Sequence, residues 1–212
     1  MHFRIITLFP KAFSSYLGES ILKRAIEDKK IRVSFYNPRD FVENKWKRVD
    51  RPPYGGGPGL VIEALPVIRA IKSALKPKSK IIFLSPSGKQ FTNAYASSVA
   101  KKYKDIIIVC GRYEGIDTRV KKVFKMDEVS VGPFVLTGGE LPAMIILDVV
   151  ARQVPGVLGN LDSIEERRVS TSQVYTRPEV FTYKNKKYRV PKILLSGHKA
   201  KIEKWRKGVD KK

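Results

Sequence analysis

Short runs of β-branched and other apolar residues alternate along the chain with segments whose apolar positions recur at helical spacing. The runs that predict strands cover residues 3–9, 31–37, 80–85, 105–110 and 127–132. The segments that predict helices cover residues 17–29, 63–75, 91–102, 116–124 and 139–154. The last helix is apolar enough that we expect it to be buried on most of its faces. Strands that alternate with helices indicate an α/β fold built on a mainly parallel sheet.

Two stretches interrupt this alternation. Residues 37–60 mix prolines, glycines, aromatic and charged residues without periodicity, which is typical of a long loop that is functional or disordered. After residues 155–160 the apolar pattern stops, and residues 163–173 have the composition of a polar linker. The predicted organisation is a larger domain, a linker and a small C-terminal domain, over residues 1–160, 161–174 and 175–212.

The chain is strongly basic. Its 212 residues include 42 Lys and Arg but 20 Asp and Glu, which gives a formal net charge of +22. Residues 183–212 hold twelve of the basic and two of the acidic residues, so this tail alone contributes +10. Such an excess favours polyanions through counterion release, so we expect a nucleic acid as the partner. The alternative for this tail is a lysine-rich end that is only solvated. Against it, Trp205 would give a helix over residues 194–208 an apolar side chain that can pack.

The few cysteine and histidine residues exclude several kinds of site. Cys110 is the single cysteine, which excludes an internal disulfide, and its apolar surroundings in the sequence indicate a core position. With only His2 and His198, we expect neither a metal site nor a Ser-His-Asp triad. The apolar run before Pro10 is too short for a signal peptide or a membrane span, so we expect a cytoplasmic protein with no membrane partner.

Glycine-rich segments are the candidates for ligand binding, and they cover residues 54–59, 85–89, 110–117 and 132–142. None has the spacing of the dinucleotide-binding fingerprint or of the Walker A motif. The last three follow predicted strands, and ligands of open α/β sheets bind at the carboxyl ends of the strands. Glycines there would let the main chain approach an adenosine closely. Taken singly, each segment is also explained as a plain turn.

Nine motifs together are more specific than any one of them. In chain order they are LFP (8–10), NPRDF (37–41), PYGGGPG (53–59), LSP-x-G (84–88), VCGRYEGID (109–117), LTGGELPAM (136–144), PGVLG (155–159), YTRPEV (175–180) and LLSG (194–197). This ordered set resembles the TrmD-type tRNA (guanine-N1)-methyltransferases, and the resemblance spans residues 3 to about 206.

The resemblance implies a SPOUT-class fold, whose sheet contains a deep trefoil knot at the cofactor site. It implies transfer of a methyl group from S-adenosylmethionine to N1 of guanine 37 of tRNA, next to the anticodon, and family practice suggests that magnesium helps. It also implies a homodimer with active sites at the subunit interface, and a small, mostly helical, basic C-terminal domain that grips the anticodon arm.

The resemblance also assigns residues to three roles. The cofactor-binding residues it implies are Leu84, Ser85, Pro86, Gly111, Tyr113, Glu114, Gly115, Ser130, Val131, Gly132, Leu136, Gly138, Gly139 and Pro142. The RNA-binding residues that we expect from it and from the basic tail are Asp50, Tyr54, Gly55, Gly56, Gly57, Arg177, Lys199, Lys204 and Arg206. The catalytic residues that we expect are Arg152, Glu114 and Glu166.

The chemistry makes its own demands on the catalytic residues. Guanine N1 carries a proton at neutral pH, so methylation needs a base for that proton and a cation near O6. Arg152 matches the family arginine proposed for O6, and Glu114 matches a glutamate that faces the cofactor and the target base. Taken alone, Arg152 would be read as a favourable cation at a helix C-terminus.

The base is the main departure from the family pattern. The family places a catalytic aspartate in the linker, in a pattern like S-x-x-E-D-S-F, whereas this chain has Arg167 at that position when counted without a gap. A one-residue deletion would place Glu166 there, and Asp162 and Glu165 are the other acids nearby. We predict Glu166 as the base, against the alternative of an ordinary solvated linker.

Two further functions stay open at this stage. One is an RNA-binding relative whose catalysis is lost or altered, and the other is a knotted methyltransferase that acts on ribosomal RNA.

The loop before PYGGGPG also departs from the family, because the common Asp-Asp pair is Asp50 followed by Arg51.

Overall fold

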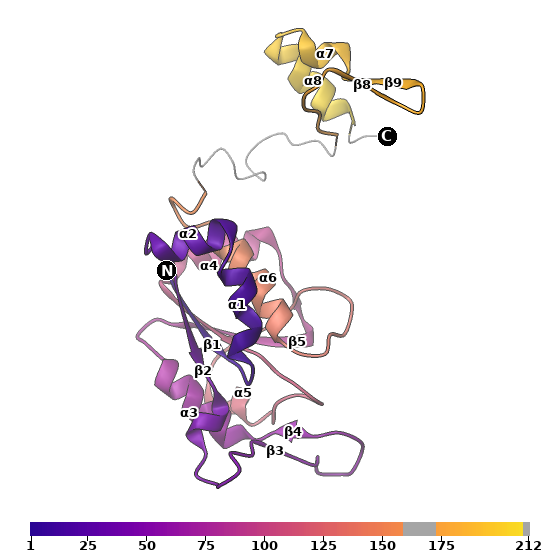
Figure 1. Ribbon diagram of the computed structural model, residues 1–212. Helices are drawn as coiled ribbons and strands as arrows, with labels where there is room; N and C mark the ends of the chain where they lie inside the picture. Colours follow the sequence, from indigo (N-terminus) through magenta and orange to yellow (C-terminus); the bar gives the residue numbers. More distant parts are fainter. Residues whose placement is uncertain (159–172, 210–212) are drawn as a thin grey trace. The chain divides into compact units, whose positions relative to one another are not determined.

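A five-stranded sheet forms the centre of the larger part of the molecule (Figure 1). The computed structural model describes residues 1–158 and 173–209, and the chain divides into two compact units, Met1–Gly159 and Asn160–Lys212. The strand order is β2-β1-β6-β5-β7, and every neighbouring pair is parallel. The strands are β1 (His2–Ile6), β2 (Arg32–Tyr36), β5 (Lys80–Gln90), β6 (Asp105–Val109) and β7 (Asp127–Ser130). The predicted α/β fold with a mainly parallel sheet is confirmed.

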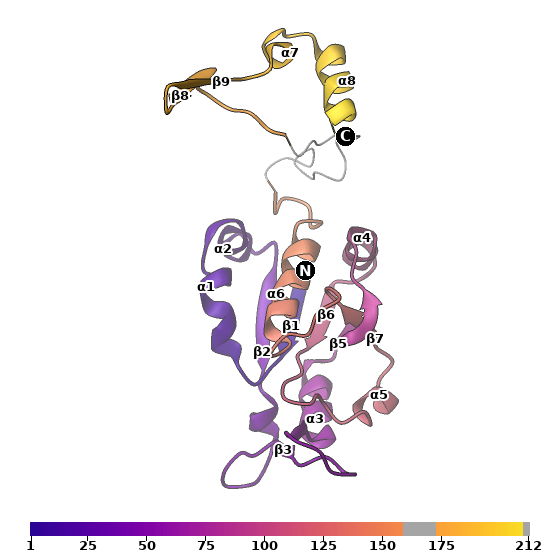
Figure 2. The same ribbon diagram turned by 90° about the vertical axis from the view of Figure 1, so that its right-hand side faces the viewer.

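Helices cover both faces of this sheet (Figure 2). One face carries α1 (Ser14–Leu17), α2 (Ser20–Glu27), α4 (Asn93–Lys102) and α6 (Glu140–Ala151). The other face carries α3 (Ala64–Ala74) and α5 (Val120–Val123). Because side chains alternate between the faces of a strand, β6 turns Ile106 and Ile108 to the first layer and Ile107 and Val109 to the second.

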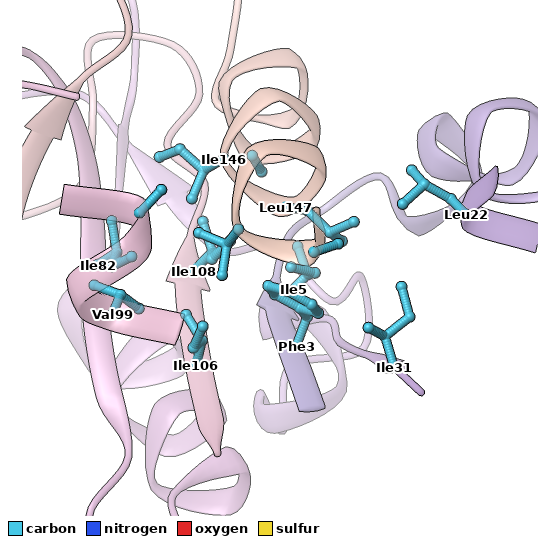
Figure 3. Close-up of a cluster of buried hydrophobic side chains, with 14 of the residues drawn as sticks. Phe3, Ile5, Leu22, Ile31, Ile82, Val99, Ile106, Ile108, Ile146 and Leu147 are labelled. Atoms are coloured by element: carbon cyan, nitrogen blue, oxygen red, sulfur yellow. The ribbon is translucent and has the colours of Figure 1, made fainter. Parts of the chain in front are cut away.

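The first layer fixes the position of α6. Figure 3 shows Leu147 of this helix towards Ile5 and Phe3 of β1 and Ile146 on the side of Ile108 of β6, and all of these side chains are fully buried. Burying an apolar side chain of this size stabilises the fold by roughly 1.5–3 kcal/mol. The middle of α6 is thereby held against the sheet.

Two helices differ from their predicted ranges, and a third has one exposed stripe. The segment 17–29 becomes α2, which begins only at Ser20 because the separate short helix α1 ends at Leu17, and the segment 116–124 keeps only the short α5. The helix begins late, at Val120, because the Asp117 carboxylate accepts a hydrogen bond of 2.9 Å from the backbone N–H of Arg119 and forms a turn before it. The expectation that α6 is buried on most faces is confirmed except for one stripe, where Leu141 and Ile145 are 52% and 37% exposed.

The predicted loop over residues 37–60 contains short regular elements. A 3-10 helix, η2 (Pro38–Phe41), begins where the Asn37 side chain accepts a hydrogen bond of 3.0 Å from the Arg39 N–H. Further along, β3 (Asp50–Arg51) pairs antiparallel with β4 (Val61–Ile62), so the glycine-rich turn between them is the tip of a short ribbon. A second 3-10 helix, η1 (Pro10–Phe13), follows β1. Periodicity cannot reveal strands of two residues.

The second unit combines a hairpin with two helices. Its elements are β8 (Val180–Tyr183), β9 (Lys186–Arg189), α7 (Lys192–Leu195) and α8 (Lys199–Val209). The helix expected within residues 194–208 is present as α8, which begins at Lys199, whereas the hairpin was not expected. Lys184 and Asn185 both have positive φ, 47° and 59°, as a two-residue type I′ turn requires. Across residues 1–158 and 173–209, no helix is long and apolar enough to cross a membrane.

Candidate active site

A pocket opens beside the carboxyl ends of β5, β6 and β7. A register shift between Leu84 and Lys89 takes part of β5 out of its ladder with β7, and residues there join the pocket wall. The pocket is lined by Leu84, Ser85, Pro86, Gly111, Arg112, Tyr113, Glu114, Gly115, Val129, Ser130, Val131, Phe134, Val135, Leu136, Thr137, Gly138, Gly139 and Pro142. Open parallel sheets bind their ligands at this edge.

The structure brings together nearly all the residues expected to bind the cofactor. Every one of them lines this pocket except Gly132, which lies in an adjacent turn where its N–H and C=O both hydrogen-bond the Ser130 hydroxyl. Sequence reasoning missed five lining residues, namely Arg112, Val129, Phe134, Val135 and Thr137. Their positions inside the glycine-bearing segments and at the end of β7 were the available signal.

Two glycines allow the pocket walls to meet. A methyl group on Gly139 would lie 2.7 Å from Cys110 Cα and 2.9 Å from Gly111 N, which is too close for main-chain atoms that cannot swing aside. The same contact carries a hydrogen bond of 2.8 Å from Gly139 N–H to Gly111 O. At Gly138 a methyl group would collide with the Arg112 side chain. Close main-chain packing therefore joins the loop after β6 to the start of α6.

A buried carboxylate reinforces this junction. Glu140, the first residue of α6, is 3% exposed, and its Oε1 accepts a 2.8 Å hydrogen bond from the Thr7 hydroxyl. Its Oε2 accepts a 2.9 Å hydrogen bond from Arg112 Nε in a salt bridge. The Arg112 guanidinium also lies 4.6 Å from the centre of the Phe9 ring. Glu140 thus connects the segments after β1 and β6 to α6, and an acidic residue in the first turn of a helix was its sequence signal.

Cys110 lies under the same junction. The thiol is buried at the end of β6, as its apolar surroundings in the sequence indicated. Burial raises the pKa of this thiol well above its usual value, and the charge of Glu140 adds to the shift. A thiol kept protonated is a poor nucleophile, so Cys110 belongs to the core.

The β3–β4 ribbon is joined to the pocket loop that contains Glu114. The Glu114 N–H donates a 3.0 Å hydrogen bond to Leu60 O, and the Ile62 N–H donates one of the same length to Gly115 O. A methyl group on Gly59 would lie 2.5 Å from Glu114 Oε1, so this carboxylate lies directly against the main chain of the ribbon. Glu114 therefore stands between the pocket and the glycine-rich turn.

Comparison with known proteins agrees with this arrangement. The sequence profile of the family described as "tRNA (Guanine-1)-methyltransferase TrmD" matches residues 1–212. A relative from Clostridioides difficile, a "tRNA (guanine-N(1)-)-methyltransferase", is 43% identical over 98% of this chain and 91% of its own length. One of the same name from Dictyoglomus turgidum is 44% identical over 96% of this chain and 82% of its own. The chain belongs to the tRNA (guanine-N1)-methyltransferase family. The resemblance seen in its nine motifs is confirmed.

In this family member the residues expected near the target nucleotide have contrasting environments. Asp50 is 8% exposed on β3, whereas Tyr54 at the tip of the ribbon is fully exposed. Gly55, Gly56 and Gly57 have φ values of 85°, 81° and 111°, which other residues rarely adopt. A second hollow beside Tyr54 is lined partly by Arg51, Pro52, Pro53, Glu63, Asp117 and Arg119.

The expected catalytic residues are not all brought together in one chain of this methyltransferase. Arg152 is the C-cap of α6, about 18 Å along the helix axis from Glu140 at a rise of 1.5 Å per residue, and it does not line the pocket. No side chain within residues 1–158 and 173–209 forms a salt bridge with Arg152. Asp162, Glu165 and Glu166 lie outside the described residues.

The basic residues expected to bind RNA are exposed in the second unit. Arg177 precedes the hairpin, and Lys199, Lys204 and Arg206 lie on α8. The ring of Trp205 lies 6.3 Å from that of Tyr175, so α8 has an aromatic contact inside this unit. Among the described residues, no group of three or more His, Cys, Asp or Glu side chains could hold a metal ion.

Proposed function

We propose that the protein transfers a methyl group from S-adenosylmethionine to N1 of guanine 37 of tRNA. The observation that supports this most directly is the pocket, which gathers the expected cofactor-binding residues beside the strand ends. Membership of the tRNA (guanine-N1)-methyltransferase family supports the same reaction. We expect the protein to act in the cytoplasm.

The pocket lining fits S-adenosylmethionine. Apolar groups of Leu84, Val131 and Leu136 offer a surface for the adenine ring, and the glycines leave main-chain groups open to the ribose and the amino acid. When bound, S-adenosylmethionine supplies an electrophilic methyl group next to a positive sulfur. The exposed Glu114 carboxylate, at the edge of this pocket, is suited to attract that charge.

The residues of the chain would then handle one proton and one developing charge. We assign the N1 proton of guanine to the Glu166 carboxylate, which frees the N1 lone pair for the methyl carbon while the bond from that carbon to sulfur breaks. Arg152 would hold the negative charge that develops on O6 as the proton leaves. Glu114, between the pocket and the ribbon, would orient the target base.

The distance between Arg152 and the pocket favours a homodimer. One helix cannot place both of its ends in one site, so Arg152 of one protomer would serve the pocket of its partner. The exposed Leu141 and Ile145 on α6 provide an apolar surface for such an interface. Active sites would then lie between the subunits.

The remaining features follow the family. We propose that the sheet carries a deep trefoil knot at the pocket, formed where the loops after β5, β6 and β7 meet. We propose residues 1–160 as the cofactor domain, 161–174 as the linker and 175–212 as the mostly helical domain that binds tRNA. The exposed basic residues of α8 support that last role.

The test is methyl transfer from labelled S-adenosylmethionine to unmodified tRNA transcripts that differ only at position 37. The expected result is label in the transcript with guanine at this position and none in the transcript with adenine. Calorimetric titration with S-adenosylmethionine accompanies the assay, with and without magnesium. Cofactor binding without transfer to tRNA would refute the proposed reaction, and transfer to ribosomal RNA instead would identify a different substrate.

A further inference from the structure

The hairpin of the second unit has one aromatic face. Strand register pairs Phe181 with Tyr188 and Tyr183 with Lys186, and alternation along the strands places these four side chains on the same side. The opposite side carries Val180, Thr182, Lys187 and Arg189. The aromatic side chains are thus collected on one surface of a two-stranded element.

Two of the three rings, those of Phe181 and Tyr188, are explained by the stability of the hairpin, whereas the ring of Tyr183 is not. The rings of Phe181 and Tyr188 stack with centroids 5.1 Å apart and planes 13° apart, a cross-strand pair that supports a marginal two-stranded element. Tyr183 is 59% exposed, and the one ring contact recorded for it among the described residues is with the Lys184 ammonium, at 5.7 Å. No aromatic ring of the described residues stacks on Tyr183, which extends the aromatic surface toward the turn.

The hairpin itself carries only positive charge. Residues 180–189 contain Lys184, Lys186, Lys187 and Arg189 and no acidic residue. The Lys186 ammonium lies 5.8 Å from the centre of the Tyr188 ring, so cations border the rings directly. Exposed rings beside exposed cations suit a ligand that offers flat π surfaces and phosphates together. In a duplex the base faces are covered by their neighbours, so the complementary ligand is a strand with unpaired bases.

We propose that the aromatic face of the β8–β9 hairpin is a stacking platform for unpaired bases of RNA. Tyr183 receives a base on its exposed face, and Lys184 and Lys186 neutralise the flanking phosphates. Phe181 and Tyr188 hold the hairpin in shape and continue the surface. The natural RNA would be the tRNA of the proposed function, on which this step rests, because its loops supply unpaired bases.

The test uses the full-length protein and two labelled RNAs of equal length, an unstructured single strand and a duplex. Fluorescence anisotropy is expected to show tighter binding of the single strand. Tyr183→Ala should weaken that binding about tenfold, the size of one base–aromatic contact, whereas Tyr183→Phe keeps the ring and the affinity. Thr182→Ala, on the opposite side of the same strand, is the matched control and should bind as the wild type does.

Salt dependence separates stacking from charge. Tyr183→Ala should lower affinity equally at every salt concentration, because the tyrosine ring releases no counterion. Lys186→Ala should instead reduce the slope of log K against log salt by about 0.7. Unchanged affinity in Tyr183→Ala, or an equal loss in Thr182→Ala, would overturn the platform.

Further measurements distinguish this proposal from the proposed function and from other partners. Binding of the single strand requires no methyl transfer, so a protein that methylates no tRNA and still loses affinity on Tyr183→Ala would retain the platform and refute the enzyme. Unchanged S-adenosylmethionine affinity in Tyr183→Ala would show that the first unit is intact. If Tyr183→Ala abolished binding to anionic phospholipid vesicles and left RNA affinity unchanged, the face would be a membrane contact and the proposal would be wrong.

Discussion

The pocket of the first unit and the surface of the second are held in opposite ways. Around the pocket, main-chain atoms meet at glycine contacts and Glu140 is buried among its partners. In the second unit no described residue from 173 to 208 is buried, and the basic side chains project from a hairpin and a helix. A single substitution can therefore disrupt the pocket. Substitutions in the second unit should instead lower RNA affinity in small steps that nearly add up. The predictions below test this contrast in order of expected effect.

Gly139→Val should have the largest effect. Its branched side chain would collide with the main chain of Cys110 and Gly111, which separates the two walls of the pocket. Calorimetry is expected to show no S-adenosylmethionine binding. The matched control is Gly208→Ala, where a methyl group meets nothing within 4 Å, and it should bind cofactor normally. Normal cofactor binding by Gly139→Val would show that the close contact is dispensable.

Glu166→Gln should lower turnover by about 10²–10⁴-fold, the usual contribution of a general base. The amide cannot accept the N1 proton, but it leaves the pocket unchanged, so cofactor affinity should not move. Single-turnover rates on tRNA give the measurement, with Glu165→Gln and Asp162→Asn as controls of the same charge change. Turnover that survives all three changes would mean that the proton leaves by another route.

Arg152→Ala should cut turnover by about 10²–10³-fold, the cost of losing one group that stabilises a developing negative charge. Binding of cofactor and of tRNA should change far less. A comparable loss of cofactor affinity would point to a structural role at the end of α6.

Mixing two inactive variants tests the shared site. Arg152→Ala keeps an intact pocket and Gly139→Val keeps the arginine, so each mixed dimer would have one complete site. A 1:1 mixture that exchanges subunits freely should recover about a quarter of wild-type activity. No recovery under conditions where exchange is shown by mass measurement would place pocket and arginine in the same protomer.

Glu140→Gln should have an intermediate effect. Removing the charge leaves Arg112 without its buried partner, and breaking such a pair typically costs about 3 kcal/mol of folding stability. Urea unfolding followed by circular dichroism measures this loss. Glu63→Gln breaks the exposed pair with Arg51 and should cost well under 1 kcal/mol. An equal loss of folding stability in Glu140→Gln and Glu63→Gln would contradict the contrast between buried and exposed contacts.

Single changes on α8 should have the smallest effects. Lys204→Ala and Arg206→Ala should each weaken tRNA binding a few-fold and reduce the salt slope by about 1. Glu203→Gln removes a negative charge from the same helix and should strengthen binding slightly. A loss above about 100-fold from either basic residue would indicate a specific contact in place of a distributed charge.

The sheet could be predicted because its signals are local. The β-branched runs around Phe3, Ile82 and Ile107 are buried on both faces, so nearly every residue in them is apolar and the strands are visible in the sequence. The hairpin was missed because its strands are exposed and mostly polar. Its signal was the alternation around Lys184 and Asn185, where asparagine accepts the positive φ of a tight turn.

The pocket was predicted through motifs and glycine positions, but its internal contacts were not. Nothing in local sequence pairs Glu140 with Thr7, because 133 positions separate them and only the folded chain brings them together. Arg112 was passed over for the same reason, although it lies between residues that were named. The distance from Arg152 to the pocket also depends on where α6 begins, which motif matching does not measure.

The position of Cys110 beside Gly139 allows its thiol to report on opening of the structure next to the pocket. Cys110 is the single cysteine of the chain, and a reagent reaches its buried thiol only when the surrounding structure opens; we expect that opening at the junction between the loop after β6 and α6, which lies directly against it. The alkylation rate of the native protein therefore measures how often this junction opens. A ligand that bridges the two walls must slow that rate, so thiol protection can rank ligands of the pocket without any assay of methyl transfer.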